Sequence, residues 1–320
     1  MIRVYRAGCQ AADNAGVDPA DWALPEDAIW IDLICPTREE DAVIETALSL
    51  SIPTREEMAE LEASSRLYRE NGATYVTADI LHRGDDELPA VEPVTFVLTG
   101  GPLVTIRYFE PRPFAMLAEK LEREPSLCAS GPELFLHIME AVIDRISDVL
   151  SKNAMRVEEI STHVFADRKT VGFARLITKL GRAQQAGARI DQSLSGLSRV
   201  FAFVSVDERI EGDAEARAHL KSLSRDALSL IGHNQAVAAS VNFQLSAALG
   251  LINIEQSSII KLFSVASVAL MPPTLIASIY GMNFDFMPEL SQPWGYPAAL
   301  GAMVIAGVAP LLWFKKKGWL

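Results

Sequence analysis

The chain has 320 residues, of which 49% are hydrophobic and 22% charged, and 41 acidic against 29 basic residues give a net charge of −12. This apolar composition excludes a disordered chain, and the acidic balance excludes a general nucleic-acid-binding protein, which needs Lys and Arg to neutralise phosphates. Cations are the simplest partners for such a chain. Its three cysteines have no CxxC spacing, so neither a disulfide framework nor a thiolate zinc site is expected.

The first 128 residues are predicted to form an α/β domain with a partly antiparallel sheet. Residues 1–8 and 28–34 are rich in Ile, Val and Trp, which is typical of strands. Asn71-Gly72 predicts a turn before a further strand, and Gly100-Gly101 predicts a hairpin between two more. Two capping boxes each predict the start of a short helix: Thr37 with Glu40, and Thr54 with Glu57.

Residues 129–256 are predicted to be helical and to include a long stalk helix from about residue 213. Two earlier helices are expected at about 131–166 and 170–200. Gly212-Asp213 caps a helix that meets no proline before Pro272, so this helix is expected to run unbroken into the C-terminal region. At about 1.5 Å per residue it would extend on the order of 100 Å. A helix of that length needs partners, which predicts a bundled stalk.

Two uncharged stretches near the C-terminus predict membrane spans. No charge lies between Leu262 and Asn283 or between Leu290 and Phe314, and each stretch can cross a hydrocarbon layer of about 30 Å as a helix. The alternative is a pair of buried core helices, which are usually shorter. The expected parts are a first span at 257–281, an extracytoplasmic loop at 282–293, a second span at 294–314 and a basic tail at 315–320.

The orientation of the two spans follows from their flanking charges. Lys261 lies at the start of the first span and Lys315 to Lys317 close the second, whereas the loop between them has no Lys or Arg. The positive-inside rule then predicts a multi-pass protein of the cytoplasmic (inner) membrane with both termini in the cytoplasm. No signal peptide is expected, because the first ten residues carry Arg3 and Arg6 and lack an apolar core.

Polar residues of the first predicted span recur in steps of three and four. A 3.5-residue repeat keeps one helix face toward a common axis in a parallel bundle. Of the six Ser and Thr residues between Ser257 and Tyr280, only Ser258 lies off this face. We call this face the polar stripe; it consists of Asn253, Ser257, Ile260, Ser264, Ser267, Met271, Thr274 and Ser278.

The polar stripe has two interpretations. Small residues and hydroxyls let membrane helices pack closely, so the stripe could be an oligomer interface. Alternatively it lines a water-filled axis, where hydroxyls replace part of an ion's hydration. The stripe carries no Asp or Glu. A bare divalent ion would need carboxylates, whereas Mg²⁺ that keeps its waters needs hydrogen-bond partners. The cargo of such a pathway would therefore be hydrated.

The residues at the end of the first span carry a family resemblance. Tyr280-Gly281-Met282-Asn283-Phe284 resembles the YGMNF signature of the CorA family of divalent-cation channels. The flanking segments Met287-Pro288-Glu289-Leu290 and Gly295-Tyr296-Pro297 and the terminal lysines agree with it. The resemblance extends through the stalk and more loosely over the α/β domain. It implies a CorA-like fold: a cytosolic α/β domain, a long helical stalk and two C-terminal transmembrane helices.

The resemblance also implies a homopentamer in the lipid bilayer, with the first spans around the pore. Gly281, Met282 and Asn283 would form the selectivity motif, where neutral amides hold the water shell of Mg²⁺; the alternative for Asn283 is a helix cap. Met271 matches a hydrophobic constriction, and Thr274 and Ser257 match pore-facing positions. Many members carry Asn where this chain has Ser257, and Asn253, one turn below, is the alternative polar ring.

In the CorA family, Mg²⁺ bound by acidic side chains between cytosolic domains holds the closed state. The family's acidic pair does not map onto this chain, and for each candidate a solvated surface carboxylate is the competing interpretation. The candidates are Asp207, Glu208, Glu211, Asp213 and the cluster Asp85, Asp86 and Glu87.

The predicted function is passive, potential-driven import of hydrated Mg²⁺, and of Co²⁺ and Ni²⁺ as further cargo, gated by cytosolic Mg²⁺. No enzyme activity and no cofactor beyond Mg²⁺ as transported and regulatory ion are expected, since the chain has no P-loop and no GxSxG elbow. The five histidines show no paired zinc-ligand spacing. The alternatives are a ZntB-like proton-coupled Zn²⁺ transporter, disfavoured by the intact Gly281-Met282-Asn283, and a membrane-tethered cytosolic sensor or scaffold.

Overall fold

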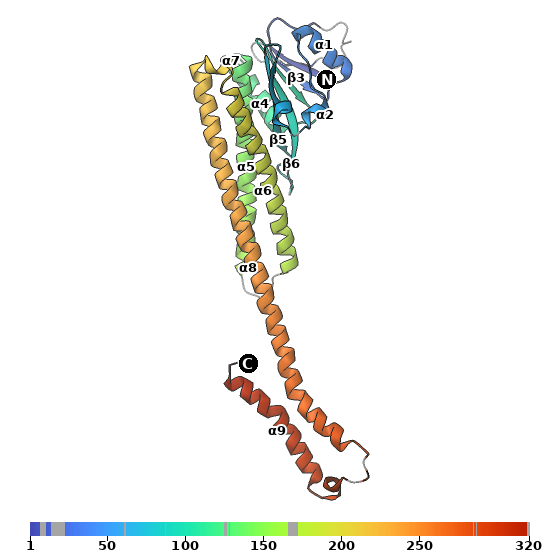
Figure 1. The fold of residues 1–320 in the computed structure, drawn as a ribbon. Helices are drawn as coiled ribbons and strands as arrows, with labels where there is room; N and C mark the ends of the chain where they lie inside the picture. Colours follow the sequence, from blue (N-terminus) through green and yellow to red (C-terminus); the bar gives the residue numbers. More distant parts are fainter. Residues whose placement is uncertain are drawn as a thin grey trace. The chain divides into compact units, whose positions relative to one another are not determined.

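The computed structural model describes residues 1–6, 11–13, 23–60, 62–86, 88–124, 127, 129–165, 172–283, 285 and 287–318. These residues form two compact units, Met1–Leu245 and Ser246–Leu320 (Figure 1). The first unit contains a β-sheet with helices, and the second contains the apolar end of one long helix and a further apolar helix. The predicted fold class is confirmed.

The described residues of the first unit form a sheet of seven strands in the order β2-β1-β3-β7-β6-β5-β4. Among these described strands, only the pair of β3 and β7 is parallel. The predicted hairpin around Gly100-Gly101 is confirmed, because β6 and β7 are antiparallel with Leu98 opposite Leu103. The strands are β1 (Ile2–Arg6), β2 (Ala11–Asp13), β3 (Ala28–Ile34), β4 (Leu67–Glu70), β5 (Ala73–His82), β6 (Ala90–Leu98) and β7 (Leu103–Arg107).

Helices cover both faces of this sheet. One face packs Ile31, Tyr75 and other strand residues against Ile44 of α1 (Arg38–Leu48) and Met58 of α2 (Arg55–Met58). The other face packs Trp30 and Phe96 against α4 (Arg112–Arg123) and the long helices that follow. Both predicted capping boxes are present, at the starts of α1 and α2. A four-residue helix, α3 (Ala63–Arg66), precedes β4.

A buried ion pair joins the two parallel strands in the middle of the sheet. Asp32 of β3 is 1% exposed and accepts hydrogen bonds from Arg107 of β7, with Nη2 2.8 Å from Oδ2. Thr105 donates to the same carboxylate at 2.7 Å, and Trp30 Nε1 donates to the Thr105 hydroxyl at 2.9 Å. Burial of two charges is tolerated here because neighbouring donors satisfy the carboxylate.

A second polar link ties the sheet to a helix. Asp79 of β5 pairs with the buried Arg66 guanidinium. Gln192 of α6 (Phe173–Val204) donates to the same carboxylate at 3.1 Å, and the Ser193 hydroxyl donates to the Asp79 carbonyl at 2.6 Å. The helix therefore lies at a fixed register on the strand.

Three long helices follow the sheet, and β-structure is absent from the described residues beyond β7. They are α5 (Gly131–Phe165), α6 (Phe173–Val204) and α8 (Ala214–Tyr280), with the four-residue α7 (Glu208–Glu211) before α8. Asp213 caps α8 as predicted, accepting a hydrogen bond from the Glu215 N–H at 2.8 Å. The prediction of one unbroken helix is confirmed, and α8 also continues through Pro272 and Pro273.

The predicted bundling of the stalk is confirmed for the part of α8 that lies in the first unit. Leu220 and Leu223 of α8 belong to the same buried cluster as residues of α5 and α6. Buried amides add specific bonds: Asn234 donates to the Gly187 carbonyl at 3.0 Å, and Gln244 donates to the Val157 carbonyl at 3.2 Å. These bonds fix the helices in register because a buried amide left unpaired is costly.

The second unit consists of the end of α8, a 3-10 turn η3 (Pro288–Ser291) and α9 (Gly295–Lys316). Among the described residues, α8 and α9 are the two helices that are long and apolar enough to cross a membrane, each with a window of mean hydropathy 1.8. Only 6% of each window is buried within the single chain. Such exposed apolar surface requires lipid or further protein around it.

Candidate functional site

One face of α8 is covered by α9. Gly307 of α9 lies against this face, where a Cβ added to the glycine would be 3.2 Å from the Ala269 carbonyl oxygen and 3.3 Å from Pro273. Val265, one turn before Ala269, is buried, and Pro272, Pro273 and Ile276 are partly covered. Glycine at position 307 therefore allows the two helices to approach closely.

The polar stripe lies on the other side of α8. At about 100° per residue, the positions of the stripe are centred roughly opposite Val265, Ala269 and Ile276. Met271, the longest side chain of the stripe, is 69% exposed in the single chain. All eight stripe residues are exposed: Asn253, Ser257, Ile260, Ser264, Ser267, Met271, Thr274 and Ser278.

The hydroxyl of Thr274 is a hydrogen-bond acceptor that the stripe presents to a hydrated ion. Thr274 Oγ1 donates its proton to the Leu270 carbonyl at 2.8 Å, within the helix. Its lone pairs remain as acceptors, because the one hydroxyl proton is already used. The water molecules around a cation point their protons outward, so an acceptor suits a hydrated cation better than a donor does. The off-stripe Ser258 makes the same kind of bond, to the Ile254 carbonyl at 2.9 Å.

The predicted selectivity residues follow the last turn of α8. The N–H of Gly281 donates to the Ala277 carbonyl at 3.0 Å, and the N–H of Met282 donates to the Ile279 carbonyl at 3.2 Å. A Cβ at position 281 would lie 3.1 Å from the Ala277 oxygen, so glycine relieves a close contact. Asn283 comes next and is exposed. Phe284, which completes the motif, lies outside the described residues.

The loop and the ends of α9 carry features typical of a membrane boundary. Glu289, the predicted loop residue, is exposed on η3. Trp294 and Tyr296 are exposed at the start of α9, and Trp313 is exposed near its end, followed by the terminal lysines. About 26 Å of helix separates Tyr296 from Trp313, close to the hydrocarbon thickness, so these rings match the two aromatic belts of a spanning helix. Sequence reasoning used the lysines and missed this aromatic spacing.

Asp85, one of the regulatory candidates, is held by three basic side chains. Its carboxylate lies 2.7 Å from Arg145 Nη2, 2.5 Å from Lys152 Nζ and 2.9 Å from Arg112 Nη1. Hydrogen bonds from Lys152 and Arg145 hold the pKa of the Asp85 carboxyl well below its usual range. The carboxylate is thus already neutralised by the chain's own cations. Asp86 beside it is exposed, and Glu87 lies outside the described residues.

The other regulatory candidates surround α7. Asp207 is buried and accepts hydrogen bonds from Thr74 at 2.6 Å and from the Arg209 N–H at 3.0 Å, so it serves as the N-cap of α7. Asp213 caps α8. Glu208 and Glu211 are exposed. Within one chain, the candidates with exposed carboxylates and no such structural task are therefore Glu208, Glu211 and Asp86.

These features together define a class of protein. A sheet-based unit, a helix of 67 residues and a second apolar helix with paired aromatic belts are the parts of a two-span membrane protein. The exposed polar stripe and the neutral motif that follows it are features of a transport protein.

Comparisons with known proteins agree with this class. Residues 25–316 match the model of the family described as "CorA-like Mg2+ transporter protein". The magnesium transport protein CorA of Haemophilus ducreyi is 33% identical over the full length of both chains. The complete structure of the CorA magnesium transporter from Methanocaldococcus jannaschii covers 100% of this chain and 98% of its own, with a TM-score of 0.81 at 19% identity. The ZntB cytoplasmic domain from Vibrio parahaemolyticus is more distant, with a TM-score of 0.53 at 10% identity over 79% of this chain and 98% of its own.

The chain belongs to the CorA family. It is therefore a transmembrane transport protein and not an enzyme, since that family consists of channels and transporters.

Proposed function

We propose that this protein is a passive channel for hydrated Mg²⁺, which it imports across the cytoplasmic membrane. The observation that carries the proposal is the position of the polar stripe on α8, roughly opposite the face that α9 covers. A face left exposed by the chain's own second span is available to line a shared axis, and it ends at Gly281, Met282 and Asn283. The relatives named as magnesium transport proteins support Mg²⁺ as the cargo.

The proposed assembly is a homopentamer in which five copies of α8 surround the pore and five copies of α9 face the lipid. The small side chains of Ser264 and Ser267 leave room for water at such an axis, whereas Met271 would narrow it. Asn283 would form a ring of neutral amides at the outer mouth. Such a ring accepts hydrogen bonds from the waters of Mg²⁺ without removing them, so the ion can also leave. Co²⁺ and Ni²⁺, which also carry water shells, are proposed as further cargo.

The membrane potential is sufficient to drive this import. Two charges that cross an inside-negative potential of 100 mV gain about 4.6 kcal/mol. The flanking lysines and the loop without Lys or Arg support the proposed orientation, in which both termini and the acidic first unit are cytoplasmic, the spans occupy 257–281 and 294–314, and the loop at 282–293 is outside. A fluorescent protein fused after Leu320 would then fluoresce in cells, and an external protease would cleave only in the loop.

Cytosolic Mg²⁺ is proposed to close the channel by binding exposed carboxylates of the first unit. Glu208, Glu211 and Asp86 are the best placed candidates, because the carboxylates of Asp85, Asp207 and Asp213 already have structural partners. Binding to one conformation alone would shift the population toward it. Replacing a sensing carboxylate by its amide should raise the internal Mg²⁺ concentration that is needed for closure.

The test is Mg²⁺ flux into liposomes that contain the full chain and a Mg²⁺-sensitive dye, with an imposed inside-negative potential. The proposal predicts uptake that depends on the potential and is lost in Asn283→Ala. Gln292→Ala, an exposed amide nearby in the loop, is the matched control and should keep its uptake. Uptake of Zn²⁺ alone, dependent on a proton gradient, would instead establish a ZntB-like transporter. No flux of any divalent cation would favour a membrane-tethered sensor.

A further inference from the structure

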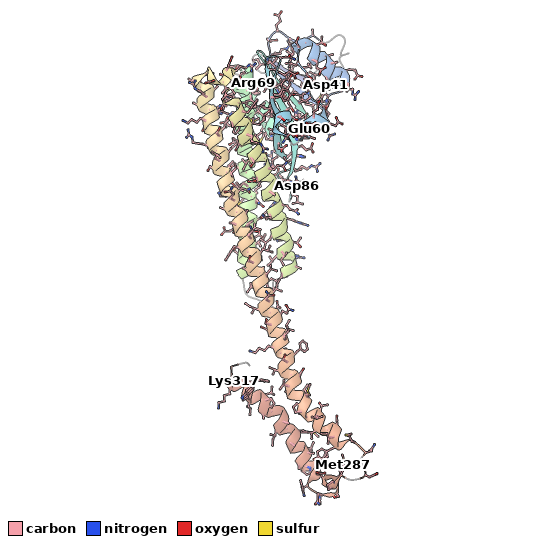
Figure 2. All side chains as sticks on the ribbon, in the orientation of Figure 1. Asp41, Glu60, Arg69, Asp86, Met287 and Lys317 are labelled. Carbon is pink, nitrogen blue, oxygen red and sulfur yellow. The ribbon has the colours of Figure 1, made fainter. Side chains whose placement is uncertain are left out.

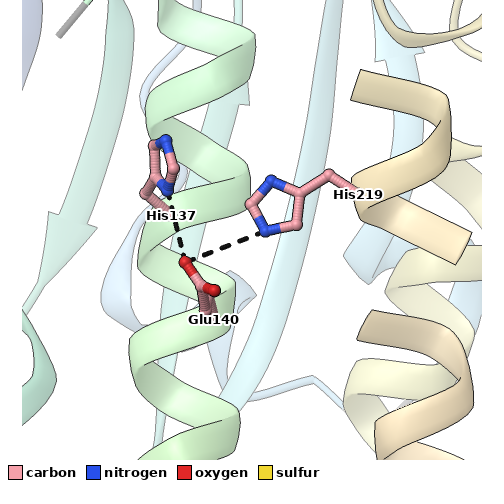
Figure 3. A group of neighbouring side chains, drawn as sticks. All are labelled: His137, Glu140 and His219. Carbon is pink, nitrogen blue, oxygen red and sulfur yellow. Dashed lines mark hydrogen bonds and ion pairs between the residues drawn. The ribbon is translucent and has the colours of Figure 1, made fainter. Parts of the chain in front are cut away.

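Two histidines and a glutamate meet between α5 and α8 in the first unit (Figure 3). His137 and Glu140 lie one turn apart on α5, with His137 Nδ1 3.3 Å from Glu140 Oε2. His219 reaches the same oxygen from α8, with its Nε2 3.8 Å away. The two imidazole rings are 5.3 Å apart between centroids. The sequence shows no paired ligand spacing because one nitrogen ligand comes from a different helix.

The three ligand atoms are close enough to share one metal ion. They lie within 4.8 Å of one another. In a tetrahedral site with bonds of about 2.1 Å, neighbouring ligand atoms are about 3.4 Å apart. The two contacts to the Glu140 oxygen are already near this value, so small side-chain rotations would complete the set. A site with three protein ligands leaves further positions open for water.

The exposure of the group suits a site that exchanges metal with solvent. The side chains of His137, Glu140 and His219 are 19%, 43% and 25% exposed. His137 and Glu140 also line a cleft of about 190 Å³ between α4 and α5, which gives an ion and its waters a way in. Figure 2 draws the described side chains of the whole chain as sticks, with the exposed regulatory candidate Asp86 labelled.

The surroundings attract a cation. Asp144 and Asp148 lie along the same cleft. Burial raises the pKa of Asp144, and the nearby negative charges of Glu140 and Asp148 raise it further. Lys120 is the opposing cation in the cleft, since the Arg145 guanidinium is paired with Asp85.

We propose that His137, Glu140 and His219 form a binding site for a first-row transition-metal dication of the Zn²⁺, Co²⁺ and Ni²⁺ class. Imidazole nitrogen suits these ions, whereas Mg²⁺ and Ca²⁺ prefer oxygen ligands alone. The bound ion would join α5 to α8, the helix that also carries the polar stripe. This site is distinct from the proposed pore and from the acidic candidates for Mg²⁺ sensing, and its occupancy does not depend on transport.

The site can be tested with Co²⁺ and the full chain in detergent. A large excess of Mg²⁺ occupies sites made of oxygen ligands, and Co²⁺ is then titrated while its visible absorption is recorded. Nitrogen ligands and a coordination number below six give much stronger bands than the hydrated ion. We expect one Co²⁺ per chain, displaced by Zn²⁺ and not by Mg²⁺, and an affinity that falls by about tenfold or more in His219→Gln.

Two further variants make the result decisive. Glu140→Gln keeps the shape of its half-exposed side chain and should weaken Co²⁺ binding while the helix content stays that of the original protein. His233→Gln changes an exposed histidine elsewhere on α8 and should bind Co²⁺ normally. The proposal is wrong if the original protein gives no band in excess Mg²⁺, or if Glu140→Gln and His219→Gln bind as tightly as His233→Gln.

Discussion

The carbonyl oxygen of Ala269 on α8 faces Gly307 on α9, and a Cβ placed at position 307 would lie only 3.2 Å from it. Within α8 this carbonyl would normally bond the N–H of residue 273, but Pro273 has none. The close approach of α9 therefore covers a carbonyl that the helix itself leaves without its usual donor. This contact identifies the face of α8 that α9 of the same chain covers.

The contact predicts the effect of a larger side chain at position 307. Gly307→Leu should separate α9 from α8 and lower the stability of the membrane unit by about 1–3 kcal/mol. Gly301→Leu is the control, because a Cβ at Gly301 meets nothing within 4 Å. Thermal unfolding of the full chain in detergent, followed by circular dichroism, measures the difference. Equal stabilities of the two variants would contradict this packing of α9 on α8.

The polar stripe predicts that Mg²⁺ uptake is sensitive to a bulky side chain at Ser264 and much less sensitive at Ser258, two serines of α8. Ser264→Leu should place a bulky side chain at the proposed axis and reduce Mg²⁺ uptake into liposomes by about tenfold or more. Ser258→Leu makes the same chemical change at the one off-stripe hydroxyl and should keep most of the uptake. Loss of uptake in Ser258→Leu with normal uptake in Ser264→Leu would mean that a different face of α8 lines the pathway.

The buried pair of Asp32 and Arg107 predicts a large loss of stability when one partner is removed. Arg107→Leu leaves a carboxylate that is 1% exposed without its cation, which should cost about 3–5 kcal/mol. Arg112→Leu, which breaks an exposed pair with Asp85, should cost less than about 1 kcal/mol. Denaturant unfolding of the full chain gives both values. The double change of Asp32→Leu with Arg107→Leu should recover part of the loss, because no buried charge is then left unpaired.

The raised pKa of Asp41 predicts that this carboxylate lowers the stability of the folded chain as pH rises. A carboxylate with a lowered pKa would do the opposite. Burial, then the nearby Glu45 and Glu40, raises the pKa of Asp41 from 3.8 to about 6. The folded chain thus binds more protons than the unfolded chain between these values, so this group's contribution to stability falls as pH rises from about 4 to 6. Asp41→Asn should therefore stabilise the protein above pH 6. Because the side chain is partly exposed, we expect a gain below about 1 kcal/mol.

The control for this prediction is Glu39→Gln, an exposed carboxylate in the same turn of α1. The free energy of unfolding of both variants is compared with that of the original protein at about pH 4.5 and pH 7.5. A gain for Asp41→Asn that is as large at the lower pH as at the higher one would contradict the raised pKa.

Much of this architecture follows from local sequence signals. The capping boxes at Thr37 and Thr54 predicted α1 and α2, because the hydrogen bonds of a capping box close within four residues. Gly212-Asp213 predicted where α8 begins. The absence of proline before Pro272 predicted that the helix continues into the C-terminal region. The four-residue elements β4, α3 and α7 and the 12-residue helix α4 were not predicted. The four-residue elements carry too few residues for a periodic signal, and α4 packs against the sheet.

The polar stripe and the group of two histidines and a glutamate differ in how far the sequence alone reveals them. The polar stripe was visible in the sequence, since its members share one helix and a fixed repeat. The aromatic spacing of Tyr296 and Trp313 was present in the sequence in the same way and was missed. The group of His137, Glu140 and His219 was invisible, because α5 and α8 are far apart along the chain.

The sequence by itself determined the order of the parts: an acidic sheet-forming region, a long helix, two apolar spans and the motif of Gly281, Met282 and Asn283. These depend on composition, periodicity and short-range hydrogen bonds, all of which act within a few residues. Only the tertiary structure decided that α9 covers the Ala269 face of α8, that Asp85 and Asp207 are already paired, and that His219 meets Glu140. Such contacts join residues distant in sequence, and the packing of helices and sheet, rather than any local preference, sets which side chains become neighbours.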